Sequence, residues 1–113
     1  MRNFLHGVKG TDVEPDAVSF HWYPCDNATL SNCTTTQWNS YATVTNQVRG
    51  WIQSDLGRLV PLGISEWNFD PGGNTTLGNN PTFMTQFTQT ALASMISANL
   101  DFATQFDTQS YGG

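Results

Sequence analysis

The sequence has few charged residues and almost no glutamate. Only 12% of its 113 residues are charged, about half the usual share, and Glu14 and Glu66 are its only glutamates. The net charge of −5 is spread along the chain without blocks, whereas nucleic-acid-binding surfaces are basic. No apolar run approaches the roughly 18 residues of a membrane-spanning helix. We therefore expect neither nucleic acid nor a membrane among its partners.

Cysteine is also scarce. Cys25 and Cys33 enclose the polar segment CDNATLSNC, a spacing that suits a local disulfide in an oxidising compartment, with two free thiols as the alternative. Neither histidine completes a metal-ligand pattern with these cysteines, so we expect no metal and no cofactor. Thr, Asn, Gln and Ser replace charge, which favours an extracellular protein. The N-terminal residues lack the apolar core of a signal peptide, so a secreted protein would carry its signal outside this chain.

Five segments show the periodicity of regular structure, in the order strand, helix, strand, helix, strand. In chain order they are expected over 17–23, 36–56, 59–66, 81–98 and 100–106. Gly57 is placed to end the first helix, and Asn80 followed by Pro81 is placed to begin the second. Strands that alternate with helices form a parallel sheet with right-handed crossovers. The sequence therefore predicts an α/β fold.

Three parallel strands make a poor independent domain, because parallel sheets normally have both faces covered. A doubly wound nucleotide-binding fold usually has a glycine-rich GxGxxG turn after its first strand, but this chain continues PCDNAT after Tyr23. The other large class is the (β/α)8 barrel, whose functional residues gather at the carboxyl ends of its strands. His21, Tyr23 and Glu66 all lie at such ends. We therefore expect a partial TIM barrel.

Glu66 ends the apolar run LGISEW. Simple alternation places Leu62, Ile64 and Glu66 on one face of this strand, and His21 and Tyr23 on the inward face of the neighbouring strand. If these faces point into a barrel, the Tyr23 hydroxyl donates to one oxygen of Glu66 and leaves the other free to attack. An ionised carboxylate held in this way is a nucleophile. The alternative is a strand-end charge that simply faces solvent.

The pairing of a strand ending FHWYP with a later strand ending GISEWN resembles strands six and seven of retaining (β/α)8 glycoside hydrolases. The resemblance is to the clan that includes cellulases, mannanases and β-xylosidases. It covers nearly the whole chain, so that residues 1–113 would be a C-terminal fragment of the barrel with strands six to eight. The resemblance implies that Glu66 is the nucleophile and that His21 and Tyr23 line the sugar site. Trp67 is either a further sugar platform or part of the helix-facing core.

The sequence departs from the pattern of this clan at the acid/base residue. In the clan that glutamate follows an asparagine near the end of strand four, and this chain has no Asn-Glu pair. Glu14 precedes the first strand, at the end opposite Glu66. Retaining hydrolysis uses two carboxyl groups about 5 to 5.5 Å apart. We therefore expect the acid to lie outside this chain, and the isolated chain to show no turnover.

A non-catalytic carbohydrate-binding domain is the alternative function. Four tryptophans and the secreted composition suit it, but such modules are typically all-β sandwiches. The open edges of three strands also predict a property of the isolated chain, because unpaired edges invite pairing and a small core gives little margin against chain entropy. We expect the isolated chain to be loosely folded or to self-associate through these edges.

Overall fold

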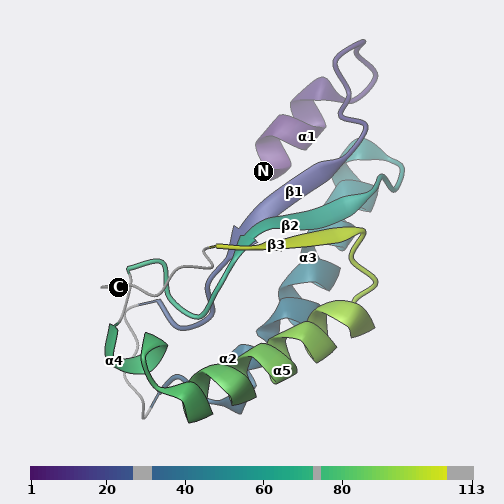
Figure 1. Cartoon of the computed structure of the whole chain (residues 1–113). Helices are drawn as coiled ribbons and strands as arrows, with labels where there is room; N and C mark the ends of the chain where they lie inside the picture. The colour runs from purple at the N-terminus through teal and green to yellow at the C-terminus, as the bar shows by residue number, and fades with distance from the viewer. Residues whose placement is uncertain (27–31, 73–74, 107–113) are drawn as a thin grey trace.

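The computed structural model describes residues 1–26, 32–72 and 75–106. In chain order the elements are α1 (Arg2–Val8), β1 (Val18–Trp22), α2 (Thr35–Trp38), α3 (Ser40–Leu56), β2 (Leu62–Trp67), α4 (Thr75–Gly78), α5 (Pro81–Ser97) and β3 (Phe102–Gln105). The strands form one parallel sheet in the order β1-β2-β3, and α3 and α5 lie on the same side of it (Figure 1). The predicted parallel α/β fold is confirmed.

Two helix boundaries follow the expected local chemistry. The Asn80 side chain accepts a hydrogen bond from the backbone N–H of Phe83 at 3.0 Å, and Pro81 occupies the first position of α5. At the end of α3, Gly57 adopts a left-handed φ of 85° and its N–H donates to the carbonyl of Gln53. Glycine adopts this conformation without the steric cost that a side chain imposes.

Other boundaries differ from the expectation. The single helix expected over 36–56 is two helices, α2 and α3, which meet at Asn39; Thr34 and Gln37 cap the start of α2 reciprocally. Strand β2 begins at Leu62 rather than at 59, because Pro61 has no N–H to contribute to the ladder. The short helices α1 and α4 were not predicted.

The core lies between the sheet and the helices. One cluster of buried side chains joins α1, α3 and the start of β2, and includes Leu5, Ile52 and Leu62. The other joins α2, the start of α3, α5 and the carboxyl ends of the strands, and includes Tyr41 and Phe87. Helix α1 is therefore held on α3 through Leu5, as well as through two hydrogen bonds from the Arg2 guanidinium to Asp55 at 2.7 and 2.9 Å.

The opposite face of the sheet is open. Ser19 and His21 on β1 are exposed, and so is Phe102 on β3, which pairs with Gly63 on β2. A β-carbon added at Gly63 would lie 2.4 Å from the Phe102 ring, so the absence of a side chain lets that ring lie across the strand. Among the described residues, no helix combines the length and apolar character needed to cross a membrane.

Candidate active site

A β-bulge near the end of β2 sets the direction of Glu66. The pairing of β1 with β2 runs from Phe20 opposite Ile64 directly to His21 opposite Glu66, which leaves Ser65 as an extra residue on β2. An inserted residue reverses the alternation of side chains beyond it. Ile64 therefore faces the helices and is buried, whereas Glu66 faces the open side with His21.

Because of this bulge, the predicted alternation of side chains along β2 is wrong beyond Ile64. Leu62 and Ile64 do not share a face with Glu66; both are buried in the helix-facing core. Without the bulge, Glu66 would point beneath α3 and α5, where an ionised carboxylate is costly. Sequence reasoning missed Ser65, because a period of two gives no signal for one inserted residue.

The carboxylate of Glu66 is held at one oxygen. The Tyr23 hydroxyl donates to Glu66 Oε2 at 2.7 Å, which is the hydrogen bond expected from the sequence. His21 Nδ1 lies 3.4 Å from the same oxygen, a contact that becomes an ion pair when the imidazole is protonated. The Glu66 side chain is 35% exposed, and within the described part of the chain no residue holds Oε1. The described residues thus engage one oxygen of this partly exposed carboxylate and leave the other without a donor.

The loop that follows Tyr23 is closed by the predicted disulfide. Cys25 and Cys33 are bonded, with 5.3 Å between their α-carbons, and both are buried. The indole N–H of Trp38 donates to Cys33 Sγ at 3.3 Å, and the N–H of Cys25 donates to the carbonyl of Phe69 at 2.8 Å. The bridge thus ties the exit of β1 both to α2 and to the chain that leaves β2.

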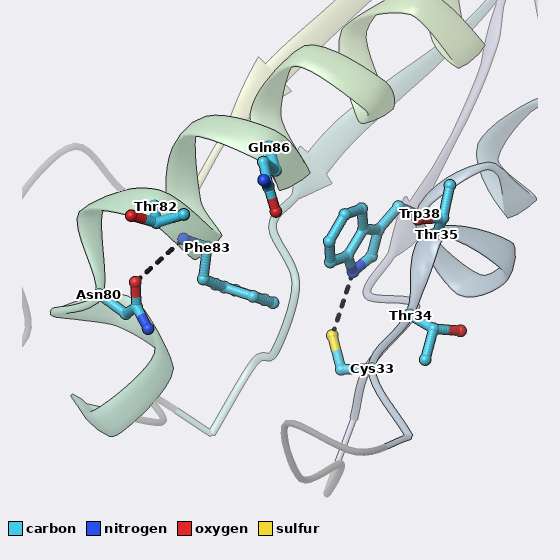
Figure 2. A pocket seen from close by; sticks show the side chains of 8 residues that line it. All are labelled: Cys33, Thr34, Thr35, Trp38, Asn80, Thr82, Phe83 and Gln86. Atoms are coloured by element: carbon cyan, nitrogen blue, oxygen red, sulfur yellow. Dashed lines mark hydrogen bonds between the residues drawn. The ribbon is translucent and has the colours of Figure 1, made fainter.

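A hollow lies between α2 and the start of α5, and Glu66 does not line it (Figure 2). Its volume is about 350 Å³, and hydroxyl and amide side chains line it together with Trp38 and Phe83. The two rings meet edge to face at 5.6 Å between centroids and are buried in the core. They therefore offer no open face for stacking against a ligand, and His21, Tyr23 and Glu66 do not line the hollow.

The side chains of Trp22 and Trp67, near the strand ends, lie on the face of the sheet that the helices cover. Trp22 faces the helices, where its indole N–H donates to Ser40 Oγ at 2.9 Å. Trp67 is only 4% exposed and packs against Tyr41 and Phe87, with centroids 6.1 and 6.3 Å away. The interpretation of Trp67 as a sugar platform is therefore wrong: beyond the bulge, alternation returns this side chain to the core.

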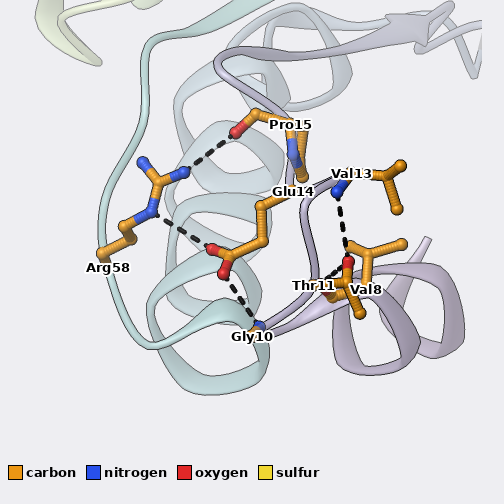
Figure 3. A network of polar contacts seen from close by, with 7 residues as sticks. All are labelled: Val8, Gly10, Thr11, Val13, Glu14, Pro15 and Arg58. Carbon is orange, nitrogen blue, oxygen red and sulfur yellow. Dashed lines mark hydrogen bonds and ion pairs between the residues drawn. The ribbon is translucent and has the colours of Figure 1, made fainter.

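Glu14 lies at the opposite end of the sheet and is fully engaged there (Figure 3). One of its oxygens accepts the N–H of Gly10 at 2.8 Å, and the other accepts Arg58 Nε at 3.3 Å. The hydrogen bond from Gly10, together with the Arg58 guanidinium, lowers the pKa of the Glu14 carboxyl. Glu14 thus has a structural role before the strands begin.

Within the described residues, no group of three His, Cys, Asp or Glu side chains is placed to hold a metal ion. Comparisons with protein-family models, with curated proteins and with solved structures found no match. Fold and site together define a class: a parallel α/β protein with a tyrosine-held carboxylate at the carboxyl edge of its sheet.

Proposed function

We propose that this chain is the C-terminal part of the catalytic barrel of a retaining glycoside hydrolase, with Glu66 as its nucleophile. The observation that carries the proposal is the 2.7 Å hydrogen bond from the Tyr23 hydroxyl to Glu66 at the carboxyl edge of a parallel sheet. That edge is where barrel enzymes place their chemistry. His21, beside the same oxygen and exposed, lines the sugar site.

The arrangement suits nucleophilic attack for two reasons. The hydrogen bond from Tyr23 occupies one oxygen of the carboxylate and leaves the other for attack on the sugar. Because Tyr23 and His21 both meet Oε2, the carboxylate is held in one orientation, and Oε1 is the oxygen that forms the bond to the anomeric carbon. Fixed geometry of this kind supplies a large part of many catalysed rates.

The second carboxyl group comes from outside the described chain. A retaining mechanism needs an acid about 5 to 5.5 Å from the nucleophile, and the other glutamate, Glu14, is bonded to Gly10 and Arg58 before the strands begin. The chain therefore supplies the nucleophile half of the reaction, and the rest of the barrel supplies the acid that protonates the leaving oxygen.

Uncovered apolar side chains at both flanks support an incomplete barrel. Met1 and Phe4, at the start of α1, are exposed at the β1 side of the sheet. Leu92 and Ile96 are 42% and 75% exposed on α5, at the β3 side. The radius of gyration is 15.6 Å, against about 13 Å for a compact domain of this length. In a closed barrel, neighbouring strands and helices cover such flanks. The isolated chain is expected to use them for self-association.

The buried disulfide supports an extracellular location, because such bonds persist in oxidising compartments. The rival function, a non-catalytic carbohydrate-binding domain, loses support in two ways. The sheet is parallel and covered by helices rather than an all-β sandwich, and Trp38 and Trp67 are buried instead of forming a platform. A binding module would hold a sugar without ever forming a covalent bond to it.

Covalent labelling tests the proposal on this chain without the missing acid. The probes are 2,4-dinitrophenyl 2-deoxy-2-fluoro-β-glucoside and the corresponding mannoside. Dinitrophenolate leaves without protonation, so labelling requires only that Glu66 Oε1 bonds to the anomeric carbon as the bond to the leaving oxygen breaks. We expect intact-mass spectrometry to show one added fluoroglycosyl group, and peptide mapping to place it on Glu66.

Two variants show whether the label depends on Glu66 and on its bond from Tyr23. Glu66→Gln should abolish the label. Tyr23→Phe should slow it roughly 10-fold or more, because hydrogen bonds to charged groups contribute about 1.5 to 3 kcal/mol. A label on Asp70, or one that forms equally fast in Glu66→Gln, would reject Glu66 as the nucleophile. Binding of sugar by the parent chain with no label from either probe would favour the binding module.

A further inference from the structure

Asn68, two residues beyond Glu66, is a buried amide whose hydrogen-bonding groups are engaged on both sides. Its side chain Nδ2 donates to the carbonyl of Phe106 at 2.9 Å, and its Oδ1 accepts the N–H of Phe69 at 2.9 Å. Its backbone carbonyl accepts the hydroxyl of Tyr41 at 3.0 Å. With 3% of its surface exposed, Asn68 cannot reach a sugar on the open face.

These bonds connect the exits of all three strands. Phe106 follows β3, and its N–H also donates to the carbonyl of Trp67 at 3.0 Å. Phe69 accepts the N–H of Cys25 from the disulfide loop that follows β1. Tyr41 belongs to α3 and is itself fully buried. One side chain therefore ties the exit of β2 to β3 directly, and to β1 through its neighbour Phe69.

The bulge explains why the end of β2 needs such support. Ser65 is skipped in the register with β1, where only its hydroxyl reaches the carbonyl of Phe20 at 3.5 Å, and the register with β3 also shifts between Ile64 and Trp67. A bulge disrupts the ladder of hydrogen bonds around it, so the strand itself fixes Glu66 less firmly than a regular strand would. The bonds beyond Trp67 supply the restraint that the interrupted ladder lacks.

We infer that Asn68 is a positioning residue that holds the end of β2 so that Glu66 meets Tyr23 and His21. The inference rests on the proposed function, since it gives Asn68 a purpose in aligning the nucleophile. Asn68 acts through the backbone of Trp67 and Glu66 and touches no substrate. Because a displacement of about 1 Å can cost on the order of 10²-fold in rate, this restraint matters even though it is remote from the sugar.

The test uses the imidazole signals of the chain's two histidines in ¹H–¹⁵N spectra of the full chain, folded alone or in the assembly it forms. His21 reports the position of Glu66, and His6 on α1 serves as an internal reference. Glu66→Gln first defines how the His21 signals move when the carboxylate is lost. Asn68→Asp keeps the shape and replaces the Nδ2 donor with a carboxyl oxygen, which cannot donate to the Phe106 carbonyl when ionised. In this variant we expect the His21 signals to move in that direction while the His6 signals stay in place.

Two further variants keep the inference open to rejection. Tyr41→Phe removes only the bond to the Asn68 carbonyl and should move the His21 signals the same way by less, so it decides the question if Asn68→Asp fails to fold. Asn79→Asp makes the same chemical change at an exposed turn and should leave both histidines unchanged. Parental His21 signals in folded Asn68→Asp or Tyr41→Phe would overturn the inference, because a purely stabilising residue lowers stability without moving them.

Labelling kinetics separate this inference from the proposed function. If the parent chain is labelled on Glu66, Asn68→Asp should lower the maximal labelling rate about 10- to 100-fold with little change in the probe concentration for half-saturation. If the parent chain is not labelled, the proposed function is rejected, whereas the imidazole experiment still tests whether Asn68 positions Glu66. If Asn68→Asp is labelled as fast as the parent, the positioning role of Asn68 is rejected and the assignment of Glu66 as the nucleophile stands.

Discussion

The two glutamates of this chain lie at opposite ends of one sheet and have opposite surroundings. Glu14, before β1, has both oxygens engaged, one by Gly10 and one by Arg58. Glu66, at the end of β2, has one oxygen held by Tyr23 and His21, while no described residue holds the other. A fully bonded carboxylate stabilises a loop, whereas a half-bonded one retains an oxygen that can react.

The difference arises from backbone geometry as much as from the partners. Glu14 closes a loop onto the N–H of Gly10, whose φ of 78° favours glycine. Glu66 reaches the open face only because Ser65 is inserted into the strand before it. β-Bulges are over-represented next to active sites, where they re-aim one side chain without rebuilding the strand.

Exchanging each glutamate for glutamine gives the largest expected effect. Under the proposed function, Glu66→Gln in the complete barrel should lower glycoside hydrolysis on the order of 10⁴-fold or more, as loss of a nucleophile does in other enzymes that form covalent intermediates. Glu14→Gln should leave hydrolysis near parental and lower the melting temperature slightly. Initial rates on aryl glycosides and thermal unfolding of both variants measure the two effects. Equal rate losses in both variants would erase the contrast between the two ends.

The sequence predicted the parts of the site that depend on strand and helix order. Five segments with clear periodicity were enough to bring the ends of β1 and β2 together, and hence to predict the bond from Tyr23 to Glu66. Helix α1 was missed because seven residues are too few for a period to stand out. Its position depends instead on a tertiary contact, between Arg2 and Asp55, which no local pattern contains.

The errors at the site share one physical cause. Alternation assumes a regular ladder, and the insertion of Ser65 shifts every later side chain of β2 to the other face. That shift moved Glu66 away from the side of Leu62 and Ile64, and placed Trp67 in the core. The predicted pairing of Tyr23 with Glu66 was correct despite this error. It depended on the two residues lying at neighbouring strand ends, whichever face each strand presented.

The disulfide restrains the Glu66 end of the sheet and not the Glu14 end, so its removal tests the difference between the two ends. Replacing both Cys25 and Cys33 with alanine should lower the free energy of unfolding by roughly 2.5 kcal/mol, the chain-entropy value for a closed loop of about nine residues. Denaturant unfolding measures the loss, and reduction of the parent protein should reproduce it. Hydrogen exchange should quicken around Tyr23 and Trp38 but not around Glu14. Uniform quickening across the sheet would show that the two ends are not independent.

The smallest expected effect is a loss of stability in acid at the Glu14 end of the sheet. Hydrogen bonding and charge from Arg2 lower the pKa of Asp55, which lies in the last turn of α3. The N–H of Gly10 with Arg58 lowers the pKa of Glu14. A carboxyl whose folded pKa is below its unfolded value, about 4, contributes stability that is fully present above that value. This contribution is lost as the pH falls through the folded pKa. Stability should therefore decline below about pH 5.

Asp55→Asn and Arg2→Met remove the same ion pair from its two sides, and each should flatten this decline. Unfolding in denaturant between pH 7 and pH 3 measures the slope, with the parent less stable in acid and each variant closest to the parent at the lowest pH. The variants should differ most from the parent near neutrality, because Asp55 is fully ionised there and its pair with Arg2 is intact. If the acid slope of Asp55→Asn matched that of the parent, the ion pair would contribute nothing to folding. The stability of the Glu14 end would then depend on the bonds of Glu14 to Gly10 and Arg58 and on the packing of Leu5 and Ile52.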